Sequence, residues 1–322
     1  MTPHPNLPVL PELPLVGREK AIARLHRLFG SASDHPPFFL VTGESGVGKT
    51  RIIHVLAEEA RRRGWTVAHG RAYPLETGMP YALLSDALLP LLQNLDDARL
   101  NVLTRGRASE LRRLFPALGP AQAPAIGGED PDELRSRLYW GFHEFLVALG
   151  TRTPLLLVLE DLHSADPSSL SLLHFVARQL GDAPVRILAS YNDDYRDANE
   201  RLVGLERSLL GLRGLERHPI RPLTSDQTMS LVEGIFGVSG QPLRAFGQRL
   251  YGWTLGNPFF IEQILVALVD SGQLHQRDGL WLGWESRELR LPGTVRDAIH
   301  LRLTDLHEAA HVVAECLAVV GA

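Results

Sequence analysis

The sequence predicts an α/β fold in which a parallel sheet lies between two layers of helices. Apolar runs of strand length alternate with helical patterns, which is typical of parallel sheets. The run at 155–160 is apolar until it ends in acids, as expected of a strand covered on both faces. A glycine-rich segment at 43–50 stands between the first predicted strand and a helix. In such a fold, ligands are expected at the carboxyl ends of the strands.

The first elements follow a proline-rich start. Prolines at 3, 5, 8, 11 and 14 favour a flexible extended arm over residues 1–14, so we expect ordered structure to begin near Leu15. A helix is predicted at about 19–29 and a buried strand at 38–41. After the glycine-rich segment, one apolar helical stripe is formed by Ile53, Leu56, Ala57 and Ala60.

The later elements divide into an insertion, a second α/β stretch and a helical end. A strand is predicted at 65–72, and the region of about 75–150 reads as a helical insertion interrupted by prolines. Strands are then predicted at 155–160, 185–191 and 218–220, with helices from Asp166 to about 180 and at 200–210. From 224 onward the pattern is helical, with a small hairpin at 273–284.

The segment Gly43-Glu44-Ser45-Gly46-Val47-Gly48-Lys49-Thr50 matches the phosphate-binding pattern G-x-x-x-x-G-K-[ST]. Glycines let the backbone wrap a phosphate with its N–H groups, and the following helix presents its positive end. Lys49 adds a cation, Thr50 supplies a hydroxyl ligand for Mg²⁺, and Arg51 follows within the first helical turn. The sequence therefore predicts a nucleoside-triphosphate site.

Two acids complete the expected metal site. Glu160 and Asp161 end the apolar run about a hundred residues after the loop. One acid would bind Mg²⁺ or its waters together with Thr50, and the other would orient an attacking water. The pattern does not say which acid has which role.

The composition excludes several classes of protein. The formal charge of −4 over 322 residues offers no general basic field for nucleic acid. The single cysteine, Cys316, rules out an intrachain disulfide and fits a reducing compartment. No segment has the features of a secretion signal or of a membrane span. We therefore expect a cytoplasmic protein that does not bind membranes.

Four motifs follow one another along the chain. They are Leu15-Val16-Gly17-Arg18-Glu19, the phosphate loop, Leu159-Glu160-Asp161-Leu162-His163-Ser164-Ala165-Asp166 and Gly256-Asn257-Pro258-Phe259-Phe260-Ile261-Glu262. In this order they resemble the motifs of STAND-type ATPases, most closely the AAA-type ATPase module of large ATP-binding LuxR-family regulators and related bacterial signalling proteins. The resemblance implies an ATP/ADP switch placed between a sensor and an effector. It also allows nucleotide-dependent homo-oligomers.

The resemblance also implies particular contacts with the nucleotide. Val16, Gly17 and Arg18 would lie near the adenine, and Pro258 would press on the base or ribose from a helical lid. Pro258 also has a purely structural explanation, because proline is favoured at the first position of a helix. Asp166 is explained by capping the helix that begins at Pro167.

One departure from the family pattern affects the expected rate. The family's threonine-tyrosine-arginine after the fourth strand is Ser190-Tyr191-Asn192 here. Asn192 can hydrogen-bond a phosphate or a water, but it cannot neutralise the charge that develops during phosphoryl transfer. Arg196 is a candidate to supply that charge instead. We expect slow Mg²⁺-dependent hydrolysis.

The domain prediction follows from these motifs. We expect a P-loop nucleotide-binding domain at 15–223, a helical lid at 224–290, and a linker with the start of a truncated winged-helix region at 291–322. The sensor and effector are expected to be missing or separate, and the chain alone is not expected to bind DNA specifically. The alternatives are a non-hydrolysing nucleotide-binding scaffold and a relative of AAA-type DNA-replication initiators.

Overall fold

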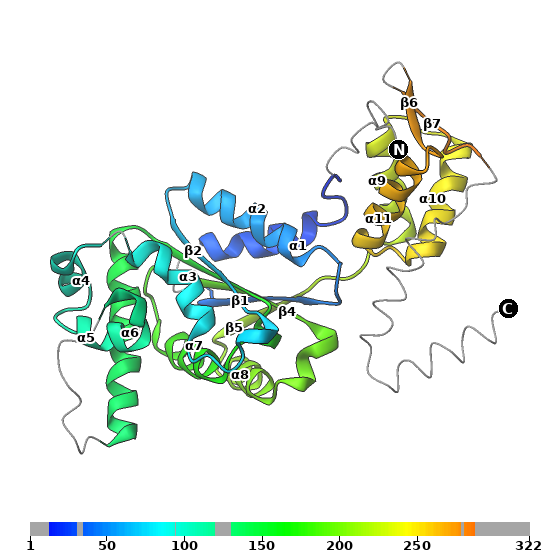
Figure 1. Cartoon of the computed structure of the whole chain (residues 1–322). Coiled ribbons are helices and arrows are strands. Elements are labelled where there is room, and N and C mark those ends of the chain that lie inside the picture. Colours follow the sequence, from blue (N-terminus) through cyan, green and yellow to red (C-terminus); the bar gives the residue numbers. More distant parts are fainter. Residues whose placement is uncertain (1–12, 31–34, 94, 120–129, 278–279, 287–322) are drawn as a thin grey trace, which may run out of the picture. The chain divides into compact units, whose positions relative to one another are not determined.

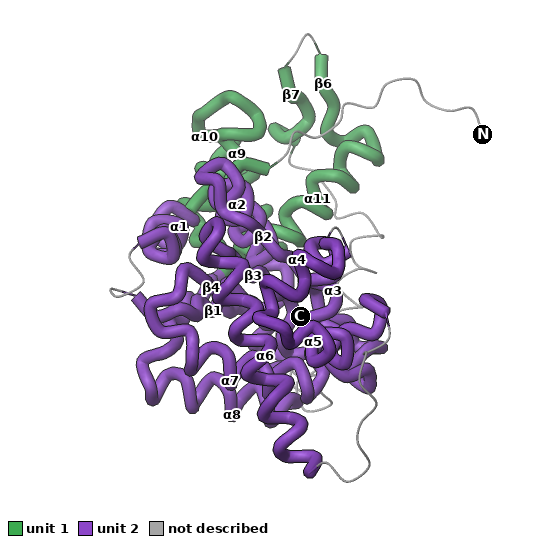
Figure 2. The backbone as a smooth tube through the Cα atoms, turned by 90° about the vertical axis from the view of Figure 1, so that its left-hand side faces the viewer, with its two compact units in different colours: residues 1–17, 222–322 green, residues 18–221 purple. Residues whose placement is uncertain are grey.

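The computed structural model describes residues 13–30, 35–93, 95–119, 130–277 and 280–286. These residues form two compact units, shown in Figure 2. Unit 2 comprises residues 18–221, and unit 1 comprises residues 1–17 and 222–322, of which the structure describes 13–17, 222–277 and 280–286. The region at 291–322, predicted to begin a winged helix, lies outside the described residues.

Unit 2 is built on a five-stranded sheet in the order β2-β3-β4-β1-β5. The strands are β1 (Phe38–Gly43), β2 (Thr66–Arg71), β3 (Leu155–Glu160), β4 (Val185–Asn192) and β5 (Leu215–Pro219). Every pairing is parallel, and all residues of β1, β3 and β4 are buried. The predicted three-layer α/β fold is therefore confirmed.

Helices cover both faces of this sheet. Figure 1 shows α1 (Glu19–Leu25) and α2 (Lys49–Arg62) over one face, and α7 (Pro167–Gln179) and α8 (Glu200–Gly211) over the other. Between β2 and β3 lie α3 (Ala82–Leu92), α4 (Asp97–Leu103), α5 (Ala108–Leu114) and α6 (Pro131–Arg152). At Gly70 of β2, an added Cβ would come within 2.7 Å of the Ala87 nitrogen, so only glycine lets α3 pack this closely.

Unit 1 has its own core of helices. It contains α9 (Ser225–Phe236), α10 (Gln241–Thr254), α11 (Pro258–Asp270) and the antiparallel pair β6 (His275–Arg277) and β7 (Leu280–Leu282). The predicted hairpin is thus present. Within the described ranges, no single helix is long and apolar enough to cross a membrane, and only α10 and α11, taken as a pair bent by 120°, meet that criterion of length and composition.

Leu13, two residues before the predicted start of order near Leu15, is buried in the core of unit 1. Two local predictions need correction. The helix predicted at 19–29 ends at Leu25 and continues as a 3-10 turn, His26–Phe29. The strand predicted at 218–220 is Leu215–Pro219, whose polar residues reflect an edge strand with one side partly exposed.

Candidate nucleotide site

The phosphate loop connects β1 to α2 in unit 2. Gly43, Gly46 and Gly48 all have positive φ angles, of 148°, 82° and 95°, which favour glycine. A Cβ at Gly43 would also lie 2.4 Å from the carbonyl oxygen of Ile220. The loop therefore needs glycine at Gly43 both for its backbone conformation and for its contact with the segment after β5.

Lys49 is the first residue of α2 and is only 8% exposed. Its Nζ donates hydrogen bonds to the carbonyl oxygens of Gly43 at 2.9 Å and Glu44 at 2.8 Å. Burial lowers the pKa of Lys49, although nearby carboxylates, first Asp161 and then Asp193, oppose this shift. The ammonium is thus held within the loop that is expected to receive the phosphates.

The side chains of Thr50, on α2, and Glu160, at the end of β3, lie in hydrogen-bond contact. The Thr50 hydroxyl donates to Glu160 Oε2 at 2.6 Å, and His69 Nε2 lies 2.7 Å from Glu160 Oε1. Burial alone raises the pKa of Glu160, but the hydrogen bonds with His69 and Thr50 outweigh it, so the pKa is lowered. A hydroxyl and an ionised carboxylate are oxygen ligands that Mg²⁺ prefers. These two side chains fit a magnesium ion.

Asp161 has a different environment. It lies in the left-handed region with φ of 59°, and its Oδ2 accepts a hydrogen bond from Arg71 Nε at 2.7 Å. Arg71 Nη2 is 2.6 Å from the same oxygen. The two predicted acids are therefore held separately, Glu160 by Thr50 and His69, and Asp161 by Arg71.

Asn192 ends β4, opposite Gly43 of β1 in the sheet register. Its side-chain Oδ1 accepts a hydrogen bond from the backbone N–H of Asp194 at 3.2 Å, and its own backbone N–H donates to His163 Nδ1 at 3.3 Å. Asp194 Oδ2 in turn accepts from the Ser45 amide at 3.5 Å. Asn192 thus caps the 3-10 turn Asp193–Ala198, and that turn brings a carboxylate to the phosphate loop.

Glu44, within the phosphate loop, lies near the carboxylate of Asp194. Burial raises its pKa, and the charge of Asp194 adds to the shift, while Lys49 opposes it. Two carboxylates, those of Glu44 and Asp194, therefore lie near each other on the side of the loop that faces the end of β4. A phosphate bound to this loop would meet the charges of both.

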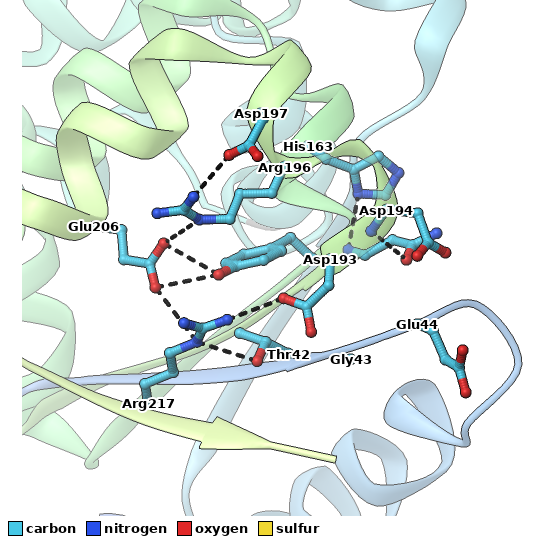
Figure 3. Close-up of polar contacts among 12 residues, drawn as sticks. Thr42, Gly43, Glu44, His163, Asp193, Asp194, Arg196, Asp197, Glu206 and Arg217 are labelled. Carbon is cyan, nitrogen blue, oxygen red and sulfur yellow. Dashed lines mark hydrogen bonds and ion pairs between the residues drawn. The ribbon is translucent and has the colours of Figure 1, made fainter. Parts of the chain in front are cut away.

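Arg196, the candidate to supply positive charge near the phosphates, is paired with two acids. As Figure 3 shows, its guanidinium donates to Glu206 at 2.8 Å and to Asp197 at 2.7 Å. Glu206 is buried on α8 and also accepts from the Tyr191 hydroxyl at 3.1 Å, while Arg217 Nε lies 3.4 Å from it. Burial and the Glu206 charge raise the pKa of Tyr191. In this conformation, Arg196 is bound within this network.

Arg18 contacts the phosphate loop in a way that the sequence did not indicate. Its buried guanidinium donates to the Val47 carbonyl at 2.8 Å and to the Arg221 carbonyl at 2.7 Å, and its expected position near the adenine stays a prediction. Burial lowers the pKa of Arg18, with Glu19 opposing. Val16, Gly17 and Pro258 belong to unit 1, where Pro258 opens α11 after the Asn257 cap. Their contacts with adenine stay predictions.

Several residues of the site were missed in the sequence. His69 and Arg71 lie two residues apart on β2 and reach the two acids, and Asp194 reaches the loop. The sequence did contain a pattern that could have identified His69 and Arg71. The strand at 65–72 was predicted, and alternate residues near its carboxyl end share one face. Its position beside β3, however, depends on a strand order that the sequence does not state.

Comparison with known proteins gives relatives at low identity. A curated protein of Rhizobium meliloti (strain 1021), described as uncharacterized, is 24% identical over 273 residues; the match covers 78% of this chain and a quarter of the relative's length. A STAND protein with a tetratricopeptide repeat sensor from Pyrococcus horikoshii matches with a TM-score of 0.45 and 13% identity, covering 92% of this chain and 33% of that one.

Two further structures come from other archaea. The ORC2 protein of Aeropyrum pernix, solved as ADPNP-ADP complexes, has a TM-score of 0.47 at 15% identity, with 83% of this chain and 65% of that chain covered. Cdc6p from Pyrobaculum aerophilum has a TM-score of 0.47 at 17% identity, with 84% and 64% covered.

A family model also matches the chain. Residues 14–188, more than half of the chain, match the family described as the AAA ATPase domain. The matched segment includes the phosphate loop and both acids, Glu160 and Asp161. The chain belongs to the AAA ATPase domain family.

Proposed function

We propose that this chain binds ATP and ADP with Mg²⁺, hydrolyses ATP slowly, and acts as the nucleotide switch of a transcriptional or signal-transduction regulator. The observation that carries the proposal is the approach of Thr50 and Glu160, whose side chains lie 2.6 Å apart beside a glycine-rich loop that holds Lys49. The resemblance to STAND-type regulators supports the switch role. Membership in the AAA ATPase family supports nucleotide binding.

In the proposed site, each part of the chain has a defined task. The loop amides and the start of α2 bind the phosphates, and Lys49 exchanges its bonds with the Gly43 and Glu44 carbonyls for phosphate oxygens. Thr50 and Glu160 hold Mg²⁺, which supplies charge neutralisation at the phosphates when it is bound. Asp161, fixed by Arg71, orients the attacking water.

Slow turnover follows from the charges near the end of β4. Asn192 brings no positive charge, and Arg196 is engaged with Glu206 and Asp197. Asp194, beside the Ser45 amide, opposes further negative charge. Since phosphoryl transfer is accelerated mainly by stabilising charge, this arrangement favours a long-lived ATP state.

The experiment uses the two lysines of the sequence, Lys49 and Lys20. Lys49→Ala is expected to weaken ATP and ADP binding at least about 100-fold, because a charge-assisted bond to phosphate in a desolvated loop is lost. Lys20→Ala, on the exposed surface of α1, is the matched control and should bind like the wild type. Calorimetric titration measures both. Unchanged affinity in a folded Lys49→Ala protein would reject the site.

The two alternatives are separated by other measurements. A scaffold would retain its nucleotide without exchange or turnover, whereas a switch releases ADP and takes up ATP. A replication-initiator relative would bind DNA with an affinity that falls steeply with salt. Light scattering in each nucleotide state tests the expected homo-oligomer.

A further inference from the structure

The further inference concerns three side chains beside the magnesium position, His54, His69 and Glu160. His54 lies on α2 one turn after Thr50, His69 on β2, and Glu160 at the end of the neighbouring β3. One ligand atom from each residue lies within 4.8 Å of the other two. The two imidazole rings meet edge to face, with centroids 5.6 Å apart.

We propose that His54, His69 and Glu160 form a site for a divalent transition metal of the zinc class, beside the magnesium position and sharing the Glu160 carboxylate with it. Two imidazole nitrogens with one carboxylate suit Zn²⁺, Co²⁺ or Ni²⁺, whereas Mg²⁺ prefers oxygen ligands alone. The site goes beyond the proposed nucleotide function, since neither histidine is needed to bind ATP.

The two distances to Glu160 require only a small adjustment, while the ligand nitrogens of the two imidazoles lie within 4.8 Å of each other. His69 Nε2 and His54 Nε2 lie 2.7 Å and 3.9 Å from Glu160 Oε1. Ligands on a tetrahedral zinc, at about 2.0–2.1 Å from the metal, are spaced at about 3.3 Å. To reach that spacing, the distance from His69 to Glu160 has to lengthen by about 0.6 Å, and the distance from His54 to Glu160 has to shorten by about 0.6 Å. The side chain of His54 is 59% exposed, so it is free of the packing that would prevent this movement.

The surroundings leave room for a fourth ligand. The three residues line a pocket of about 280 Å³ together with Thr50, Gly70, Arg71, Tyr73 and Asp86. Zinc sites with three protein ligands keep an open position for water or substrate. The site thus has the protein ligands and the space of an open zinc centre.

Glu160 links this site to the magnesium position. Its Oε1 faces the histidines, while its Oε2 accepts from the Thr50 hydroxyl. A transition metal on Oε1 withdraws negative charge from the carboxylate that Mg²⁺ needs. Micromolar Zn²⁺ is therefore expected to lower Mg²⁺-dependent turnover at least about tenfold.

The test uses the nucleotide-free full chain without a histidine tag, so that it does not depend on ATP binding. Co²⁺ is the spectroscopic probe, and Zn²⁺ is titrated by calorimetry. One Co²⁺ per chain with tetrahedral visible absorption is expected. His54→Ala and His69→Ala should each weaken metal binding at least about tenfold. His174→Ala, whose imidazole bonds Ser208 on the other side of the sheet, should not change it.

The outcomes are distinct. Loss of metal binding in both variants, with wild-type circular dichroism, supports the site. No Co²⁺ binding by the wild type at 100 μM, about the weakest affinity expected of a built site, would reject it and leave His69 as a hydrogen-bond partner of Glu160. Wild-type affinity in His54→Ala and His69→Ala would also reject it. If the wild-type chain binds Zn²⁺ but does not bind ATP, the proposed nucleotide function is rejected and the metal site is not.

Discussion

At the scale of single residues, the two neighbouring acids have different partners. Glu160 is 2% exposed and bonded to Thr50 and His69, whereas Asp161 is partly exposed and paired with Arg71. Their adjacent positions after the predicted strand did not distinguish them. In the proposed site, Glu160 holds the metal and Asp161 orients the attacking water.

These roles predict different kinetic effects. Glu160→Gln is expected to remove the Mg²⁺ dependence of nucleotide affinity and to lower turnover at least about 100-fold, since a charged metal ligand is lost. Asp161→Asn should lower the turnover rate while leaving nucleotide affinity within about twofold. Single-turnover hydrolysis and titration over a range of Mg²⁺ concentrations separate the two. Wild-type Mg²⁺-dependent hydrolysis in Glu160→Gln would exclude Glu160 from the metal site.

Asp194 predicts the opposite effect on binding. Its carboxylate accepts from the Ser45 amide, one of the donors expected to face phosphate. Asp194→Asn removes a repelling charge and should tighten ATP binding roughly fivefold, more than ADP binding, since ATP carries more negative charge. Asp197→Asn, whose exposed carboxylate pairs with Arg196, is the control. Equal affinities of Asp194→Asn and the wild type would show that the carboxylate does not oppose nucleotide.

At the scale of elements, the sequence predicted most of the sheet. Phe38 to Val41 and Leu155 to Leu159 are apolar at every position, because both faces of these parallel strands are buried. The phosphate loop could be predicted because its glycines, Lys49 and Thr50 are close together in the sequence. The edge strand β5 was only partly predicted, since Glu216 and Arg217 break the apolar pattern.

The partners of the acids could not be predicted in the same way. His69 and Arg71 reach Glu160 and Asp161 only because β2 pairs with β3 in a particular register. That register results from packing of the whole sheet, including the close fit of α3 on Gly70. The same holds for Arg196, whose position depends on a buried acid ten residues later, Glu206.

Gly43 allows a test at this scale. Gly43→Ala places a Cβ 2.4 Å from the Ile220 carbonyl oxygen at a φ of 148°, so the loop or β5 has to shift. We expect a loss of roughly 1–3 kcal/mol in the free energy of unfolding and a loss of nucleotide binding. Gly204→Ala in α8, where an added Cβ meets nothing within 4 Å, should be neutral or stabilise by up to about 1 kcal/mol.

Denaturant unfolding and ATP titration check both glycine variants. If Gly43→Ala matches the wild type in both measurements, the conformation described for the loop is wrong. If Gly204→Ala is strongly destabilised, the argument from helix propensity is wrong for α8. The loss of stability in Gly43→Ala could then not be assigned to the loop.

At the scale of the whole molecule, the switch proposal predicts that nucleotide identity changes the protein beyond the loop. Small-angle scattering and hydrogen exchange of the apo, ADP-bound and ATP-analogue-bound states should differ, because a ligand shifts a conformational equilibrium by its differential contacts. The measurements require demonstrated saturation. Identical profiles in all three states would favour the static scaffold.

The chain passes between the two units twice, at residues 17–18 and at residues 221–222. Arg18 is the first residue of unit 2, Arg221 is the last, and the guanidinium of Arg18 bonds the Arg221 carbonyl and the Val47 carbonyl together. A guanidinium is planar and rigid, so the two carbonyls keep their spacing while both bonds last. The first and last residues of unit 2 are therefore tied to each other and to the phosphate loop by a single side chain.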